Sequence, residues 1–158
     1  MDLSENTMLS VFSQTTAKQV MLAQCLAYMR EHLDCWQDGS DEDLLAWLEW
    51  YWDMGLVCAM VDAKSGALGT LLVARFIERP EQFERTYVHI KGAQICVPEL
   101  LIVTDPAALE VAVCALRDRL GCPVYLMHSR SKWTRDSRPK TVRWIAFERH
   151  LRRLYAQS

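Results

Sequence analysis

One acidic residue, Glu99, interrupts a long apolar run and is the first candidate for chemistry. The run extends from Ile95 to Val103, ICVPELLIV, and is typical of a strand that is buried on both faces. Desolvation of a carboxyl group in such a strand would raise its pKa, and a carboxylate with a raised pKa can act as a general base toward an amine. The alternative is that Glu99 points toward solvent or toward a neighbouring arginine.

Tyr125 and His128 lie in a second apolar segment, CPVYLMH, which begins at Cys122. His128 ends this expected strand, at the edge where open sheets with crossover connections bind ligands. Tyr125 lies three residues earlier and therefore on the opposite side of the strand. Either side chain can donate a proton to a leaving group. Alternatively, Tyr125 is a ring at the edge of the core with its hydroxyl paired, and His128 is an ordinary residue at a strand end.

The other histidines and the cysteines do not have the spacing of metal ligands. His32, His89 and His150 are scattered along the chain. The six cysteines, at positions 25, 35, 58, 96, 114 and 122, lie mostly in apolar segments and include no Cys-x-x-Cys pair. This usage is typical of reduced core residues, so we expect no metal site.

Charge is distributed unevenly along the chain. Residues 1–116 carry a net charge of -10 and residues 117–158 a net charge of +8, from 11 Lys and Arg against 3 acidic residues. The basic part interleaves cations with one indole: Arg130, Lys132, Trp133, Arg135, Arg138, Lys140 and Arg143. This composition suits phosphate or single-stranded nucleic acid, but it also suits an exposed loop that faces the acidic half. Because the acidic half would repel a polyanion, nucleic acid is the least favoured partner.

Apolar spacing, caps and turns predict a single α+β domain over residues 1–158, with helices on the faces of a mixed sheet. The expected strands cover 8–12, 56–61, 68–77, 87–90, 95–103 and 122–128, and the expected helices cover 17–35, 106–120 and the segment between the cap Ser40 and Gly55. Residues 141–157 are ambiguous. They fit either a strand over 142–147 followed by a helix, or one helix throughout.

The second expected helix carries an unusual group of aromatic residues: Trp47, Trp50, Tyr51 and Trp52. One reading is a helix clamped between the sheet and a loop. The other is an exposed surface for a protein partner, with Trp50 and Trp52 as the contacts. No apolar run reaches the length of a membrane span, and the start MDLSENTML is not that of a signal peptide, so we expect a cytoplasmic protein.

The order of these elements resembles the GNAT superfamily of acyl-CoA-dependent N-acyltransferases. Residues 62–69, DAKSGALG, are similar to the turn between the family's second and third strands, and Glu99 to Val103 with the following Asp105-Pro106 is similar to its fourth strand. The family's fourth strand is bulged, and Pro98, which lacks an N–H, requires a bulge or an unpaired position.

The resemblance implies transfer of an acyl group from acetyl-CoA to an amine substrate. It implies that Glu99 is the general base, and that Tyr125 or His128 protonates the departing thiolate. It also implies that the backbone after Glu99 aligns the pantetheine arm of the cofactor; these residues are Leu101, Ile102, Val103 and Thr104.

The segment that would bind the pyrophosphate departs from the family pattern. GNAT enzymes use a glycine-rich loop before the helix that follows the fourth strand, whereas residues 103–110 here read VTDPAALE. There is no glycine, Pro106 removes one amide donor, and Asp105 adds a negative charge. A second hypothesis is therefore a non-catalytic, protein-binding GNAT-like module. Small proteins of this type with a basic segment after the fifth strand resemble those encoded by tailed phages and prophages.

Overall fold

A six-stranded mixed sheet forms the centre of the molecule. The computed structural model describes residues 8–11, 18–33, 39–128 and 140–155. The strands follow one another in sequence order: β1 (Met8–Val11), β2 (Val57–Asp62), β3 (Leu68–Ile77), β4 (Ile95–Val103), β5 (Tyr125–His128) and β6 (Lys140–Arg143). Neighbouring strands are antiparallel except β4 and β5, which are parallel. The α+β class predicted from the sequence is confirmed.

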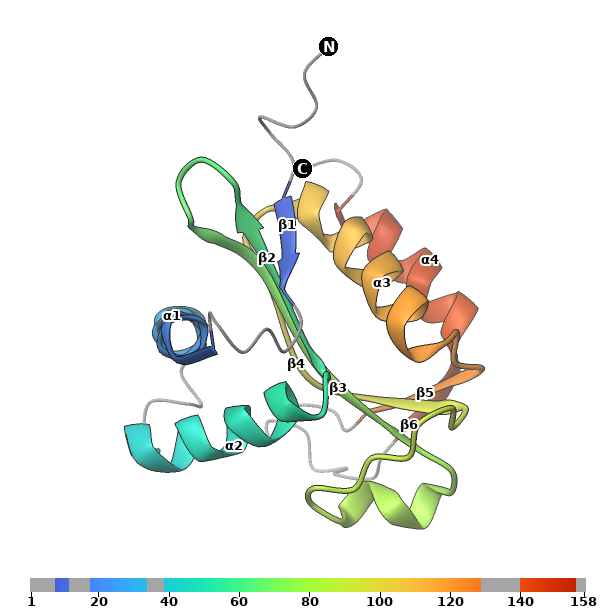
Figure 1. Cartoon of the computed structure of the whole chain (residues 1–158). Coiled ribbons are helices and arrows are strands. Elements are labelled where there is room, and N and C mark those ends of the chain that lie inside the picture. Colours follow the sequence, from blue (N-terminus) through green and yellow to red (C-terminus); the bar gives the residue numbers. More distant parts are fainter. Residues whose placement is uncertain (1–7, 12–17, 34–38, 129–139, 156–158) are drawn as a thin grey trace.

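Four α-helices cover the two faces of this sheet (Figure 1). They are α1 (Lys18–His32), α2 (Asp41–Asp53), α3 (Pro106–Leu120) and α4 (Trp144–Tyr155), and a short 3-10 helix, η4 (Pro80–Glu84), follows β3. Helices α1 and α2 pack on one face around Leu48, Tyr51 and Leu71. Helices α3 and α4 pack on the other around Leu116 and Trp144. None of the described helices is long and apolar enough to cross a membrane.

The predicted cap at Ser40 and the turn expected within residues 62–69 are present. Ser40 Oγ accepts the amide of Asp43 at 3.1 Å, and this bond caps α2. Strands β2 and β3 form an antiparallel hairpin, in which Asp62 Oδ1 accepts two amides of the turn. Gly66 lies in that turn with φ 73°, a left-handed conformation that favours glycine.

Two segments differ from the sequence expectation. The predicted strand 87–90 is wrong: Tyr87 has φ 57°, which breaks an extended chain, and the carbonyl of Val88 accepts a hydrogen bond from Arg75 rather than from a strand. In the ambiguous segment, a strand precedes a helix, as one alternative predicted, but only residues 142–143 of its strand 142–147 are extended and 144–147 are helical. The helix begins at Trp144, earlier than the expected boundary.

Strand β4 contains the bulge that Pro98 predicts. The register pairs Val73 with Leu100 but Ala74 with Pro98, which leaves Glu99 as the extra residue in β4. The backbone of Pro98 faces away from β3, on the side of β5. Its missing N–H therefore costs no hydrogen bond between β3 and β4. The bulge thus sets the position of Glu99 in the middle of the sheet.

Candidate functional site

An open wedge separates the second half of β4 from β5. The two strands pair only at Ile95 with Tyr125 and at Cys96 with Leu126, and no further pair between them is present in the described part of the chain. In Figure 1, β5 lies beside only one end of β4. The gap holds a pocket of about 410 Å³, which we call the wedge pocket. Its lining residues are Pro98, Glu99, Leu100, Leu101, Leu126, His128, Phe147 and His150.

The free edge of β4 presents backbone groups to this wedge. The amide of Thr104 donates to Gly69 O at 2.8 Å, and the register pairs Val103 with Thr70. In an antiparallel ladder, this arrangement directs the N–H and C=O groups of Leu101 and Val103 away from β3, while Ile102 bonds to β3. Two of the four residues expected to align a pantetheine arm therefore offer their backbone to the wedge.

The other two of those four residues do not face the wedge. Ile102 is 6% exposed and belongs to the core beneath α1 and α2. The hydroxyl of Thr104 lies 2.7 Å from that of Tyr28 on α1, and it also donates to the carbonyl of Gly69. The expectation that Thr104 holds a cofactor is therefore not supported by its position.

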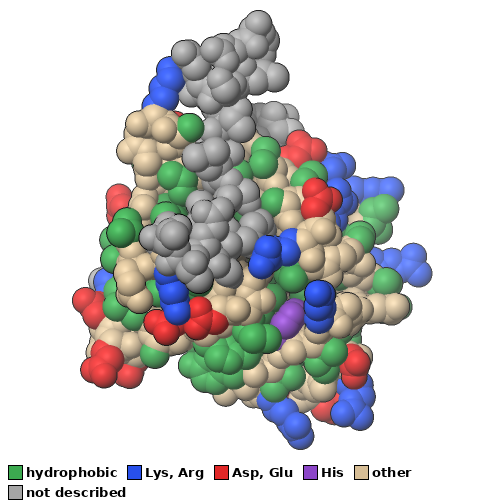
Figure 2. All heavy atoms as spheres, in the orientation of Figure 1, with side chains coloured by type: hydrophobic (Ala, Val, Ile, Leu, Met, Phe, Trp, Pro, Cys, Tyr) green, Lys and Arg blue, Asp and Glu red, His purple; other side chains and the backbone are tan. Residues whose placement is uncertain are grey.

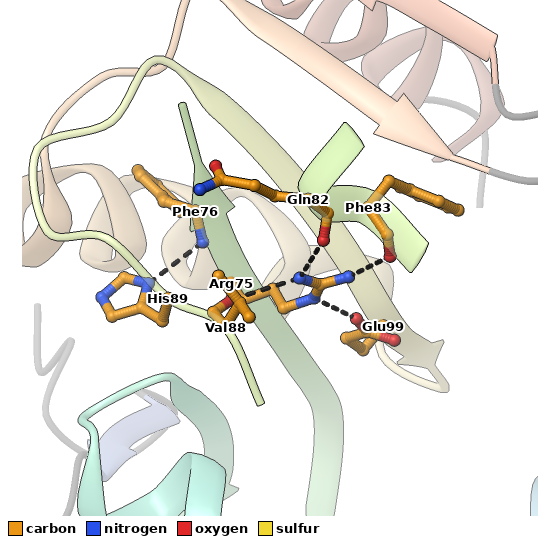
Figure 3. Close-up of polar contacts among 7 residues, drawn as sticks. All are labelled: Arg75, Phe76, Gln82, Phe83, Val88, His89 and Glu99. Atoms are coloured by element: carbon orange, nitrogen blue, oxygen red, sulfur yellow. Dashed lines mark hydrogen bonds and ion pairs between the residues drawn. The ribbon is translucent and has the colours of Figure 1, made fainter. Parts of the chain in front are cut away.

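Glu99 points from the bulge toward a buried arginine on β3. Its Oε1 accepts from Arg75 Nε at 2.7 Å, and the side chain of Arg75 is only 3% exposed (Figure 3). The side chain of Tyr51, on α2, lies close to the Glu99 carboxylate. Burial, and then the charge of Glu99, raise the pKa of the Tyr51 hydroxyl far above its ordinary value, so Tyr51 remains a donor.

Arg75 connects Glu99 to the segment around η4. Its terminal nitrogens donate to the carbonyls of Gln82 and Val88, each at 3.2 Å, and to that of Phe83 at 2.5 Å. Arginine cannot lose its proton in a protein, so its buried charge needs these acceptors. The pair predicted as the alternative for Glu99 is present, and it fixes the orientation of the carboxylate.

A second pocket opens on the α2 side of Glu99. It has a volume of about 220 Å³, and we call it the aromatic pocket. Its lining residues are Trp47, Tyr51, Arg75, Phe83, Glu84, Arg85, Thr86, Tyr87 and Glu99. Among the residues that line either pocket, Glu99 alone belongs to both. A carboxylate therefore lies at the boundary between a cleft with free backbone donors and a small cavity walled by rings.

The structure separates His128 from Tyr125. His128 lines the wedge pocket together with Glu99 and is partly buried. Tyr125 lies at the closed end of the wedge, where β4 and β5 pair, and is 39% exposed. Of the two residues predicted as proton donors, only His128 shares a pocket with Glu99.

The aromatic residues of α2 correct one expectation. Trp52 is 1% exposed and lies in the core with Leu48 and Leu56, so the prediction that it is an exposed partner contact is wrong. Trp50 is half-buried, and its ring lies against those of Tyr51 and Tyr87. The rings of α2 therefore serve the core and the aromatic pocket, as the clamped-helix reading predicted.

The start of α3 does not fit a pyrophosphate group. The amides of Thr104 and Asp105 both donate to Gly69 O, at 2.8 and 2.9 Å, and Pro106 has none. The amide of Ala107 donates to the Asp105 side chain at 3.1 Å, and that of Ala108 to the Asp105 carbonyl at 3.0 Å. From 104 to 108, no amide is free for an anion.

Two further predictions concern a metal site and the basic segment. No group of three His, Cys, Asp or Glu side chains that could hold a metal ion is present in the described ranges. Most of the basic segment, including Lys132, Trp133 and Arg135, lies outside them. Lys140 and Arg143 lie on the exposed strand β6.

Sequence reasoning missed Arg75 and the aromatic pocket. Arg75 is a charged residue in an apolar strand, LGTLLVARFI, which is the same signal that identified Glu99. Two opposite charges in adjacent buried strands indicate an ion pair, so this contact had a readable signal. The sequence carries no signal for the left-handed conformation of Tyr87, because this conformation depends on the bonds that Arg75 makes to the neighbouring residues.

Comparisons with known proteins show the fold. A match among solved structures is "GphF GNAT-like decarboxylase in complex with isobutyryl-CoA", with a TM-score of 0.51 and 17% sequence identity. The match covers 77% of this chain but only 64% of that chain, so the present chain spans less than two thirds of its length. No family model and no curated protein matches the sequence. The chain has a GNAT-like fold, as its order of elements predicted.

Proposed function

We propose that this protein transfers an acyl group from a thioester to an amine, with Glu99 as the general base. The observation that carries this proposal is that Glu99 lies between the wedge pocket and the aromatic pocket. The wedge receives the thioester along the free edge of β4, and the aromatic pocket receives the amine. Both substrates then meet at one carboxylate.

The aromatic pocket has the chemistry of a site for a cation. Trp47 and Tyr87 supply rings whose faces attract an ammonium group, and the lining holds two acids, Glu84 and Glu99, against two cations, Arg75 and Arg85. Arg75 is already neutralised by Glu99 and three carbonyls. The rings therefore make a small amine a suitable occupant of this pocket.

The transfer proceeds by attack of the amine nitrogen on the thioester carbonyl carbon. The C–N bond forms and the C–S bond breaks, which gives an amide and a thiol. An ammonium substrate first loses one proton to solvent; Glu99 then takes a proton from the attacking nitrogen. His128 donates a proton to the thiolate, and both side chains return to their starting states by exchange with solvent.

A decarboxylase activity is the second candidate, because the structural neighbour is described as a GNAT-like decarboxylase. In that reaction the wedge would hold a malonyl-type thioester whose carboxylate enters the aromatic pocket. The lining of this pocket holds two acids against two cations, so its charge does not separate the two activities. Acyl transfer is the favoured activity because a carboxylate between two pockets suits a general base. A cytoplasmic location and a phage origin stay predictions.

A thiol-release assay with a panel of primary amines tests the proposal. The donors are acetyl and isobutyryl thioesters of both coenzyme A and pantetheine, and a malonyl thioester is included with detection of CO₂. We expect amine-dependent thiol release at equal stoichiometry with the amide product. Release of CO₂ without an amine would favour decarboxylation, and binding of none of these thioesters would favour the non-catalytic hypothesis.

A further inference from the structure

The nucleotide part of coenzyme A has no receptor at the place where the fold would offer one. Asp105 caps α3 with its own side chain and carbonyl, and the amides of residues 104–108 are all bonded or absent. The carboxylate of Asp105 adds a negative charge next to the helix end that would otherwise attract phosphate. Phosphates in this position would gain no hydrogen bonds and would meet repulsion.

The wedge has the volume, the apolar wall and the backbone hydrogen-bonding groups that suit a pantetheine arm. Its volume, about 410 Å³, lies within the range of small-molecule sites. Its wall is largely apolar, and the backbone of Leu101 and Val103 is positioned to bond the two amides of such an arm as an added strand would. The site therefore matches the thioester end of a donor and not its nucleotide end.

Strand β6 and helix α4, which follow the wedge in the chain, are basic, although Arg152 pairs with Glu110 of α3 at 3.6 Å. The described segment 140–153 carries five Lys and Arg, namely Lys140, Arg143, Arg149, Arg152 and Arg153, against the single acid Glu148. Figure 2 shows Lys and Arg side chains gathered on the side of the molecule that α4 occupies. Lys140 pairs with His128 across β5 and β6, so one of these cations lies at the open end of the wedge.

We propose, on the basis of the function proposed above, that the natural acyl donor is a phosphopantetheine thioester carried on an acidic carrier protein, not free acyl-CoA. The wedge takes the arm, and the surface formed by Lys140, Arg149 and their neighbours takes the acidic protein around it. A carrier places one phosphate near the start of α3 where coenzyme A places two, and its negative surface gains contacts with the cations that coenzyme A does not make.

Steady-state kinetics with three donors of the same acyl group tests this inference: acyl-pantetheine, acyl-CoA and an acyl carrier protein loaded with the same acyl chain. We expect kcat/KM for acyl-CoA to be within about threefold of acyl-pantetheine, because the nucleotide adds no contact. The loaded carrier should exceed both by at least about tenfold at low salt and lose that advantage as ionic strength rises. Adenosine 3′,5′-bisphosphate should not inhibit at millimolar concentration.

Charge-reversal variants show where the carrier docks. Lys140→Glu with Arg149→Glu should lower kcat/KM for the carrier about tenfold and leave that for acyl-pantetheine unchanged. Lys64→Glu is the matched control and should change neither value, because Lys64 lies on the β2–β3 turn, which is on the other side of the molecule from α4 in Figure 1.

Three results would overturn the inference. The first is a preference of about tenfold or more for acyl-CoA over acyl-pantetheine, which would show that the nucleotide is bound. The second is a carrier no better than acyl-pantetheine. Turnover of acyl-CoA under either result leaves the proposed acyl transfer intact. The third is no turnover of any thioester, which would instead reject the proposed function and this inference with it.

Discussion

At the scale of single residues, the account depends on a charged pair in the middle of an apolar sheet. Glu99 and Arg75 each interrupt a buried strand, and the structure brings their charged atoms to 2.7 Å. The sequence left two readings of Glu99 open. It is either a general base or a carboxylate that points toward solvent or a neighbouring arginine. The structure shows the ion pair, and the pair orients the carboxylate toward both pockets.

Removal of Arg75 should destabilise the protein strongly. Arg75→Met leaves the Glu99 carboxylate and three carbonyls without their donor, and we expect a loss of about 3 kcal/mol in the free energy of unfolding. This value is at the low end for a broken buried pair because Glu99 is 27% exposed and can regain water. Urea unfolding of Arg75→Met, Glu99→Gln and the double variant measures the coupling. The double variant should cost at least about 1 kcal/mol less than the sum; additive costs would show that the two side chains do not interact.

His89 should make the stability depend on pH. Its Nδ1 accepts the amide of Phe76 at 3.0 Å, and burial lowers the pKa of the imidazole below its ordinary value of 6.5. The folded state therefore disfavours protonation. Stability is fully present above the unfolded pKa of about 6.5 and is lost as the pH falls through the window down to the lowered pKa.

His89→Asn tests this pH dependence, because the amide oxygen can replace Nδ1 as the acceptor but does not titrate. The free energy of unfolding of this variant should vary less than that of the wild type between about pH 7.5 and about pH 5.5. His32→Asn, at the exposed end of α1, serves as the control. An identical slope in the wild type and His89→Asn would contradict the role of the buried imidazole.

At the scale of elements, most of the chain was readable from its sequence. The cap at Ser40 and the apolar spacing predicted the helices and most strands, and the turn expected within residues 62–69 joins β2 to β3. Pro98 predicted the bulge, because a central strand cannot contain proline without one. The segment 87–90 was misread since its conformation depends on bonds from Arg75 on another strand, which no local pattern encodes.

Helix α2 has two kinds of tryptophan, and substitution should distinguish them. Trp52 is buried against the sheet, so Trp52→Ala should cost about 3 to 5 kcal/mol of stability. Trp50 touches the rings of Tyr51 and Tyr87 at the surface, so Trp50→Ala should cost only about 1 kcal/mol. Thermal or urea unfolding measures both. Equal and small effects would mean that Trp52 is exposed, as the partner hypothesis first assumed.

At the scale of the whole molecule, different elements form the two pockets that Glu99 lines. Helix α2, η4 and residues 85–87 form the aromatic pocket with Arg75 and Glu99, and β4, β5 and α4 form the wedge, so two pockets lead to Glu99. The element order predicted the fold class, but the aromatic pocket could not be predicted. It is assembled from α2, η4 and a left-handed turn that lie far apart in the sequence.

Glutamate variants at two positions test whether the amine binds in the aromatic pocket. Glu84 lines the aromatic pocket but not the wedge pocket. Glu84→Gln should therefore raise KM for the amine several-fold, on the order of one charge interaction at a partly exposed site. Its kcat should change little. Glu78 is exposed and lines neither pocket, so Glu78→Gln should behave as the wild type. An unchanged KM in Glu84→Gln would place the amine elsewhere.

The most direct test of the central claim is the rate of acyl transfer by Glu99→Gln. The amide still accepts the hydrogen bond from Arg75 but cannot take a proton from the amine. With folding confirmed by its melting temperature and thioester affinity unchanged, kcat should fall by about 10² to 10⁴, the usual contribution of a general base. A kcat within about threefold of the wild type would contradict the assignment of Glu99 as the base.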